Sequence, residues 1–392
     1  MSFSIQMQTI PSKDVELEIE ERTTLNYLLT FPTGCKKKDP KGIIFTIPGY
    51  GDTAVSEYQS KKLRPYLADK YNCIVAGVRY HNDQRFKDNY TINTDGICRF
   101  YGLEPSYFAN CKNGNDAVSL ISTILTSRGI YRLDPLVALS RECYDTYNSF
   151  GFLPALDHLR VLFDIINNYA IIKKKIIAFG SSYGGYIAML MGKYAPQTFS
   201  LIIDNSGYCV ADLPSIIGNL GSFSGASISF DNQGRRHEIS EVINNKWNMD
   251  ETSPLYFSDS HKKIRNLLEE SHRVASDTIY SNFHSVQDTL VPVRQKDRFV
   301  DIISKYNRTV YMRVDKNDID GKIFKTLDHG MSASLQGLYD YSINNIASLK
   351  KKNDDSSDFD LNSKYSFLCC DKVYNFAYDN KGLNVWIEKF KK

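Results

Sequence analysis

The stretch Lys175–Gly185 reads KIIAFGSSYGG and indicates the fold class of the whole chain. A short strand-like segment, KIIAF, runs into a G-x-S-x-G pattern centred on Ser182, and the apolar run YIAMLMGKY follows. Small residues are needed on both sides of such a serine, because a strand that turns sharply into a helix passes close to itself. The stretch therefore predicts a buried strand, a tight turn carrying Ser182, and a helix.

A serine in this position is suited to nucleophilic chemistry. The turn exposes its hydroxyl, and the N-terminus of the following helix favours negative charge that develops nearby. Ser181 is the weaker candidate, because its position in the motif points a side chain away from the substrate. A tight turn with an idle serine is the structural alternative.

Short apolar runs bounded by Gly, Pro or Asp predict strands buried on both faces of a parallel sheet. They are Gly42–Ile47, Cys73–Val78, Lys175–Phe179, Ser200–Ile203, Thr278–His284 and Thr309–Val314. Helical spacing of apolar residues predicts helices over Leu153–Tyr169, Tyr186–Tyr194, Gln295–Lys305 and Ser332–Lys350. Strands that alternate with helices predict an α/β fold with a doubly wound, mostly parallel sheet.

The chain divides into one large predicted domain and a small appendage. We expect residues 1–350 to form the α/β domain, with an antiparallel lead-in over 15–31 in which VELEIE pairs with Thr24–Phe31. Segments 82–150 and 207–275 exceed ordinary loop length, so we predict that they are insertions that cover the site and select the substrate. Residues 351–392 begin with the polar KKNDDSSD and then become aromatic, which predicts a linker and a small strand-rich appendage.

Two later motifs could complete a catalytic site. The segment TIYSNFH is followed by Ser285-Val286-Gln287-Asp288 and an apolar-Pro pair, and TVYMRV is followed by Leu327-Asp328-His329-Gly330. With Ser182, these motifs resemble the α/β-hydrolase superfamily, in which nucleophile, acid and histidine occur in this order. The resemblance implies an α/β-hydrolase fold, His329 as the general base and Asp288 as the acid that orients it.

Alternatives remain open at both positions. Asp288 could be a turn residue and His329 an ordinary loop histidine. Asp204 is the second candidate for the acid, because it directly follows the strand SLII.

The resemblance also implies an oxyanion hole, which needs two N–H donors. One is the backbone N–H of Tyr183, the residue after the nucleophile. The other is the backbone N–H of Tyr50, in the loop Pro48-Gly49-Tyr50-Gly51 that follows the strand GIIFTI. Gly49 and Gly51 keep the glycines of the family's His-Gly-x-Gly loop, whereas proline replaces its histidine. A glycine-rich turn without a role is the alternative.

Phrases such as TIPGYGD, GSSYGGY and HSVQDTLVP also resemble an uncharacterised bacterial family associated with flagellar-glycosylation gene clusters of ε-proteobacteria. This resemblance implies an acylated sugar, or a sugar-linked compound, as the substrate. We therefore expect a carboxylic-ester hydrolase that deacylates such a compound through a Ser-His-Asp acyl-enzyme mechanism. The alternatives are a sugar O-acyltransferase with the same triad, and a non-catalytic binding or assembly protein of flagellar glycosylation. No cofactor and no metal is expected.

Composition restricts the partners. The 392 residues include 48 Lys and Arg against 45 Asp and Glu, a net charge of +3 that does not favour nucleic-acid binding. No apolar run is long enough to span a membrane, and the N-terminus shows no signal-peptide pattern. The eight cysteines lack metal-ligand spacing and fit reduced thiols, so we expect a cytoplasmic protein. The expected partner is a small-molecule acyl or acylated-sugar substrate. The sequence leaves the oligomeric state open.

Overall fold

The computed structural model describes residues 2–36, 38–83, 90–92, 98–99, 102–111, 116, 120, 123–124, 126–129, 139–142, 147–217, 227–232, 235–244, 247–346, 352 and 354–390. The chain forms two compact units. The first, here called the sheet unit, comprises Met1–Asp83, Gly151–Ala211 and Asp259–Lys392. The second, the insertion unit, comprises Gln84–Phe150 and Asp212–Ser258.

An eight-stranded sheet forms the centre of the sheet unit, in the order β1-β2-β4-β3-β7-β8-β11-β12. The strands are β1 (Phe3–Thr9), β2 (Leu25–Phe31), β3 (Lys41–Ile47), β4 (Cys73–Arg79), β7 (Ile171–Ser181), β8 (Leu201–Asn205), β11 (Ile279–Ser285) and β12 (Arg308–Val314). β2 is antiparallel to both of its neighbours, and the pairs from β4 to β12 are all parallel. The six strands predicted from apolar runs are all present within a few residues of their expected ends.

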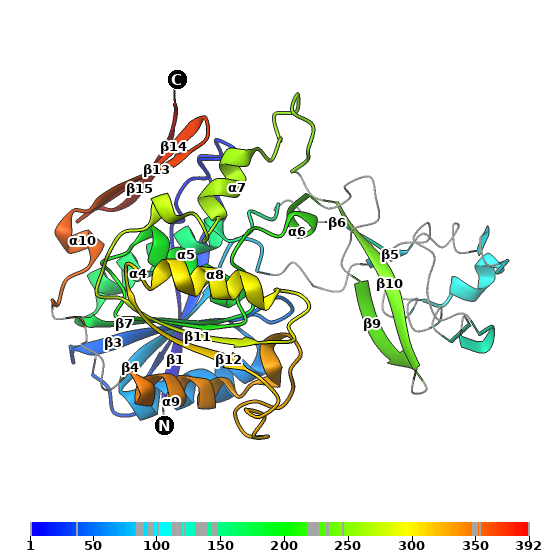
Figure 1. Cartoon of the computed structure of the whole chain (residues 1–392), viewed down its shortest axis with the longest axis horizontal. Coiled ribbons are helices and arrows are strands. Elements are labelled where there is room, and N and C mark those ends of the chain that lie inside the picture. Colours follow the sequence, from blue (N-terminus) through cyan, green and yellow to red (C-terminus); the bar gives the residue numbers. More distant parts are fainter. Residues whose placement is uncertain are drawn as a thin grey trace. The chain divides into compact units, whose positions relative to one another are not determined.

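Helices cover both faces of this sheet (Figure 1). One face carries α4 (Phe152–Asn168), α5 (Tyr183–Tyr194) and α8 (Val293–Ile303), whereas α1 (Arg64–Tyr71) and α9 (Leu335–Asn345) lie on the other. The resulting doubly wound sheet, with a serine at the sharp turn after its fifth strand, is an α/β-hydrolase fold. The predicted fold class is confirmed.

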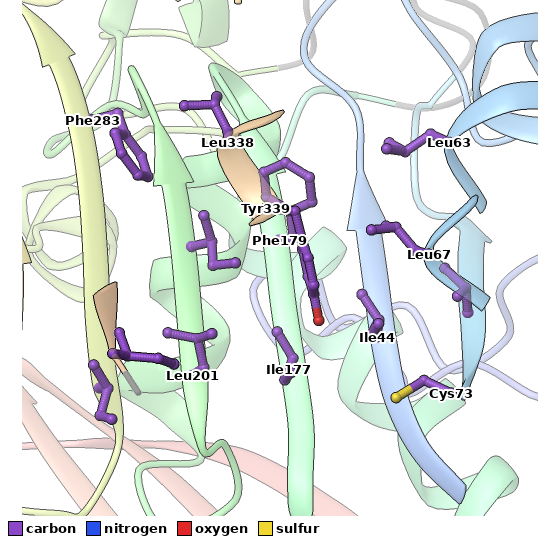
Figure 2. Close-up of a cluster of buried hydrophobic side chains, with 14 of the residues drawn as sticks. Ile44, Leu63, Leu67, Cys73, Ile177, Phe179, Leu201, Phe283, Leu338 and Tyr339 are labelled. Atoms are coloured by element: carbon purple, nitrogen blue, oxygen red, sulfur yellow. The ribbon is translucent and has the colours of Figure 1, made fainter. Parts of the chain in front are cut away.

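The core beneath α1 and α9 consists of branched and aromatic side chains from the central strands. Figure 2 shows Leu67 of α1 beside Ile44, and Tyr339 of α9 against Phe179. The rings of Tyr339 and Phe179 are 5.6 Å apart, and both residues are at most 2% exposed. Burial of such side chains contributes roughly 1.5–3 kcal/mol each. The central strands that carry the site are therefore held rigidly.

The predicted antiparallel lead-in is wrong in its first strand. β2 pairs with β1 rather than with VELEIE. Residues 14–19 instead form a tight turn, because the Asp14 carboxylate accepts hydrogen bonds from the N–H groups of Glu16 (3.0 Å) and Leu17 (3.2 Å). The Glu16 side chain turns inward to form an ion pair with Arg265, in which both side chains are fully buried. The alternating polarity of VELEIE therefore belongs to a turn that Asp14 closes, and not to a strand.

The insertion unit contains a four-stranded sheet in the order β5-β6-β10-β9. Its strands are β5 (Tyr90–Ile92), β6 (Leu139–Glu142), β9 (Ser227–Asn232) and β10 (Arg235–Asn244). The unit also contains the short helices η2 (Pro105–Phe108) and α6 (Leu213–Ile217). Both predicted insertions contribute strands, and β10 pairs with β6 in parallel. The end of the second predicted insertion belongs to the sheet unit, where it forms α7 (Asp259–Arg265) and η4 (Glu270–His272).

The C-terminal segment forms α10 (Asp358–Leu361) and a three-stranded sheet of β13 (Lys364–Cys369), β14 (Lys372–Asp379) and β15 (Gly382–Lys389). It belongs to the sheet unit, and aromatic contacts join it to α4 and α5. The Tyr374 ring lies 5.6 Å from Phe152, and Phe376 stacks on Tyr194 at 4.8 Å. Among the described residues, no helix is both long and apolar enough to cross a membrane.

Candidate active site

Ser182 lies at the turn between β7 and α5 with a backbone φ of 55° and ψ of −121°. A non-glycine residue rarely adopts a positive φ, and the surrounding contacts hold the turn in place. The Ser182 N–H donates to the Asn205 carbonyl at 2.7 Å. A Cβ at Gly184 would lie 2.0 Å from the Ile47 carbonyl oxygen, and one at Gly180 would lie 2.1 Å from that of Gly184. Glycine is therefore required on both sides of the serine, as the motif predicts.

The structure brings Ser182, His329 and Asp288 together. His329 Nε2 lies 2.7 Å from Ser182 Oγ, and His329 Nδ1 lies 2.8 Å from Asp288 Oδ2. The three residues follow β7, β11 and β12, whose carboxyl ends meet at the same edge of the sheet. The His329 side chain is 21% exposed, whereas that of Asp288 is fully buried. A neutral imidazole in this geometry can accept the serine proton while the carboxylate holds its other nitrogen.

The Asp288 carboxylate is held in its ionised form. Its Oδ1 accepts hydrogen bonds from the N–H groups of Leu290 (3.0 Å) and Val291 (2.9 Å). Burial raises the pKa of Asp288, but the hydrogen bond and charge of His329, together with the Val291 N–H, outweigh burial and lower it overall. The carboxylate therefore stays charged and fixed in direction, as an orienting acid requires.

The His329 loop has an unusual backbone. Gly330, Met331 and Ser332 all have positive φ, at 76°, 57° and 43°. The loop is anchored on both sides, because the Gly330 N–H donates to Ser206 Oγ at 3.2 Å and Met331 is fully buried in the core. His329 is the first residue of the short helix η5 (His329–Ser332). The path of the loop places its imidazole beside Ser182.

The glycine loop after β3 lies against the nucleophile. A Cβ built at Gly49 would be 3.0 Å from Ser182 Cβ and 3.6 Å from its Oγ, so a side chain here would crowd the nucleophile. Gly51 has a φ of 87°, which glycine adopts without strain. The ring of Tyr50 stacks on that of Tyr183 at 4.0 Å, and Tyr183 is the first residue of α5. The proposed N–H donors thus belong to segments beside Ser182, and their oxyanion role stays a prediction.

The alternative residues have other partners. Ser181 Oγ accepts a hydrogen bond from Asn205 Nδ2 at 2.9 Å. Asp204, the second candidate for the acid, forms a fully buried ion pair with Lys296 and accepts from the Gly207 N–H at 2.8 Å. Burial lowers the pKa of Lys296, but the charge of Asp204 outweighs burial and raises it. The acceptor for His329 Nδ1 is Asp288 and not Asp204.

Sequence reasoning missed several supporting residues. Lys296 lies on the buried face of α8 with Phe299 and Ile303, and this helical spacing of a lysine among apolar residues was a usable signal. His284 Nε2 lies 2.8 Å from the Val291 carbonyl and 3.6 Å from Asp288 Oδ2. The roles of Asn205 and Ser206, which support the serine and histidine loops, had no local signal in the sequence.

One comparison identifies a family for this chain. A family model described as "Protein of unknown function (DUF2920)" matches residues 6–115 and 136–387. The chain belongs to the DUF2920 family. Its description names no activity, so the link of the DUF2920 chain to flagellar glycosylation stays a prediction. No curated protein matches it.

Solved structures resemble the DUF2920 chain distantly. Est2, a thermophilic esterase from Thermogutta terrifontis, is 12% identical with a TM-score of 0.44, over 88% of this chain and 95% of its own. Est1E from Butyrivibrio proteoclasticus, bound to ferulic acid, is 13% identical with a TM-score of 0.42, over 83% and 96%. A protein named as a dipeptidyl aminopeptidase IV from Bacteroides ovatus is 11% identical with a TM-score of 0.45, over 88% of this chain. The DUF2920 chain spans only 35% of that protein's length. Such distant likenesses transfer no activity.

Proposed function

We propose that this DUF2920 protein is a serine hydrolase that cleaves a carboxylic ester through an acyl-enzyme. One observation carries the proposal: a continuous hydrogen-bond chain joins Ser182 Oγ, His329 and the buried Asp288 carboxylate at 2.7 and 2.8 Å. A nucleophile, a base within reach of it and a carboxylate that orients the base are the parts that acyl transfer needs.

The first half of the proposed reaction forms an ester bond to the enzyme. Ser182 Oγ attacks the substrate carbonyl carbon while its proton passes to His329 Nε2. The tetrahedral intermediate carries an oxyanion, which the N–H groups of Tyr183 and Tyr50 stabilise. Collapse of this intermediate expels the alcohol, which takes the proton from His329. The Asp288 carboxylate stabilises the imidazolium while it exists.

The second half releases the acyl group. His329 takes a proton from water while the water oxygen attacks the acyl carbonyl carbon. The second tetrahedral intermediate then collapses: its bond to Ser182 Oγ breaks, Ser182 takes the proton back from His329, and the carboxylic acid leaves. The resemblance in the sequence to a family of glycosylation clusters supports an acylated sugar as the substrate. A sugar hydroxyl in place of water would make the same site an O-acyltransferase, so the acceptor is decided by experiment.

A labelling experiment tests the nucleophile. The purified protein is treated with a serine-directed fluorophosphonate, and the adduct is mapped by peptide mass spectrometry. We expect a single adduct on Ser182, and none in Ser182→Ala. A label on another serine, or equal labelling of Ser182→Ala, would contradict the proposal.

A kinetic experiment tests the triad. With short-chain aryl esters, Asp288→Asn is expected to lower kcat by about 10⁴-fold while the protein remains folded. The matched control is Asp328→Asn, which changes the carboxylate next to His329 that does not take part in the hydrogen-bond chain. Labelling without ester hydrolysis, together with acyl transfer to an added sugar, would identify the transferase.

A further inference from the structure

A small pocket lies at the opposite edge of the sheet from Ser182. Ser182 precedes α5, whereas the pocket is lined by Lys193 near the other end of that helix, about 16 Å along it. The segment before β11 contributes His272, Arg273 and Ser276. Tyr280 and Asn307 complete the polar wall. Three lining side chains are basic and none is acidic.

Lys193 is buried in this pocket, with only 3% of the residue exposed. Its ammonium donates to the carbonyls of Ile264 (2.6 Å) and Asn266 (3.1 Å). An ammonium has three N–H donors, so these two carbonyls leave one donor for a further acceptor.

Arg273 and His272 both present buried nitrogen atoms that lack a partner. The Arg273 guanidinium donates through Nη2 to the Leu267 carbonyl and lies over the Phe299 ring, while its Nε is shielded from solvent and has no hydrogen-bond partner. His272 Nε2 bonds to the Leu368 carbonyl at 3.0 Å, while its Nδ1 is buried without a partner. Buried polar atoms in proteins nearly always have a partner, so the unpartnered Arg273 Nε–H indicates an acceptor in the pocket. His272 donates through Nε2, so its Nδ1 is itself an acceptor and takes no part in binding an anion.

The charge around the pocket is not balanced. Within the part of the chain that the structure describes, no carboxylate lies within 4.0 Å of Lys193 or Arg273, and Glu269 pairs instead with Lys263 at 3.7 Å. Burial, followed by the charge of Arg273, holds the pKa of Lys193 far below its ordinary value, and burial also lowers that of Arg273. A buried cation without a counter-charge is costly, and an anion would relieve that cost.

We propose that this pocket binds a small inorganic anion, with a halide as the form that fits it. Arg273 Nε and the third N–H of Lys193 would donate to the ion, and the Tyr280 hydroxyl supplies another donor at the pocket wall. The space holds one occupant of about the size of a water molecule, which suits a single-atom anion better than a phosphate. The site does not depend on the proposed hydrolase function.

Anomalous diffraction tests the proposal directly. Crystals of the full chain are soaked in sodium bromide, and data are collected at the bromine absorption edge. We expect an anomalous peak within hydrogen-bond distance of Arg273 Nε and Lys193 Nζ. An ordered water at this place, with no anomalous peak, overturns the proposal.

Thermal unfolding gives an independent readout in solution. Gluconate is replaced by bromide at constant ionic strength, and Tm is expected to rise by about 2 °C at ten times Kd and beyond that to rise in proportion to the logarithm of the bromide concentration. Arg273→Gln should remove this dependence, whereas Lys305→Gln, which changes an exposed lysine paired with Glu270, should retain it. An equal response in both variants contradicts the site. Fluorophosphonate labelling of Ser182 should be the same in both, which separates this result from the proposed function.

Discussion

At the scale of single residues, several strained backbone positions lie around the candidate triad. Ser182, Ser206, Met331 and Ser332 have positive φ although none is glycine. Three of them hold or support a member of the triad: Ser182 is the nucleophile, Ser206 bonds to Gly330, and Met331 anchors the His329 loop. Strained backbone of this kind persists only where the surrounding structure over-determines it. The rigid core beneath the sheet thus stabilises a geometry that the local sequence alone would not adopt.

Two substitutions of Ser182 measure this strain. Both Ser182→Gly and Ser182→Ala remove the nucleophile, but only glycine adopts a φ of 55° without a Cβ penalty. We expect Ser182→Gly to be more stable than Ser182→Ala by about 1 kcal/mol, after the greater unfolded-state entropy of glycine is subtracted. Urea unfolding curves of the two inactive variants provide the measurement. Equal stability would show that the turn is not strained.

At the scale of elements, buried ion pairs join segments far apart in the chain. Lys296 of α8 pairs with Asp204 of β8, directly behind the site. Arg265 of α7 pairs with Glu16 of the N-terminal turn, and both side chains are fully buried. A buried pair adds little net stability over an apolar pair, but the loss of one partner leaves an unpaired charge in the interior. These pairs therefore specify which elements meet.

The Lys296–Asp204 pair supports a double-mutant test. Lys296→Met leaves the Asp204 carboxylate buried without a counter-charge, and we expect it to cost about 3–5 kcal/mol. Adding Asp204→Asn to Lys296→Met should recover part of that loss, because the remaining charge is removed. The free energies of unfolding of the two single variants and the double variant give the coupling. Additive losses, within about 0.5 kcal/mol, would mean that the pair is not coupled.

At the scale of the whole molecule, the C-terminal strands are part of the sheet unit. Phe367 on β13 is 2% exposed and packs near Tyr194 of α5 at 6.2 Å between ring centres, whereas its neighbour Leu368 is 44% exposed. The Tyr378 hydroxyl also donates to the Tyr194 carbonyl at 2.8 Å. The strands thus cover the helix that follows the nucleophile.

Two adjacent residues of β13 test this packing. Phe367→Ala is expected to lower the free energy of unfolding by about 3–5 kcal/mol, because it opens a cavity against α5. Leu368→Ala, on the exposed face, should change it by less than about 0.5 kcal/mol. Circular dichroism in urea follows the main transition. A loss for Phe367→Ala confined to a separate, earlier transition would show that the strands fold as an independent appendage.

Acid should destabilise the whole fold through its buried histidines. Burial lowers the pKa of His158 from 6.5 to about 4, so the unfolded chain binds more protons than the folded one between these values. Stability is therefore complete above about pH 6.5 and declines as the pH falls towards 4. One such histidine contributes about 1.4 kcal/mol per pH unit in this window. His261, with its pKa lowered to about 2 by burial and by Arg265, adds to the slope.

The measurement is the free energy of unfolding in urea at several pH values from 7 to 4.5. The side chain of His158→Gln cannot take up a proton. The slope of its unfolding free energy against pH should therefore be shallower by about 1.4 kcal/mol per pH unit, which corresponds to one proton. An unchanged slope in this variant would contradict the assigned burial effect.

Much of the fold and of the candidate site could be predicted from the sequence, because the signals are local. The glycines around Ser182 reflect close backbone approach, and apolar runs such as Ile43–Phe45 reflect strands buried on both faces. The order of the three motifs was enough to select Asp288 and His329, which the structure joins to Ser182 by hydrogen bonds. Each motif by itself depends on neighbours within a few residues.

Only the tertiary structure decided the rest. It replaced VELEIE by Phe3–Thr9 as the partner of β2, because Glu16 turns inward to Arg265, 249 residues along the chain. It paired Asp204 with Lys296 and so left Asp288 to His329. It also built one sheet from strands of two separate insertions. Pairings of this kind depend on charge compensation and packing between distant segments, and a local pattern of polarity contains no record of the partner.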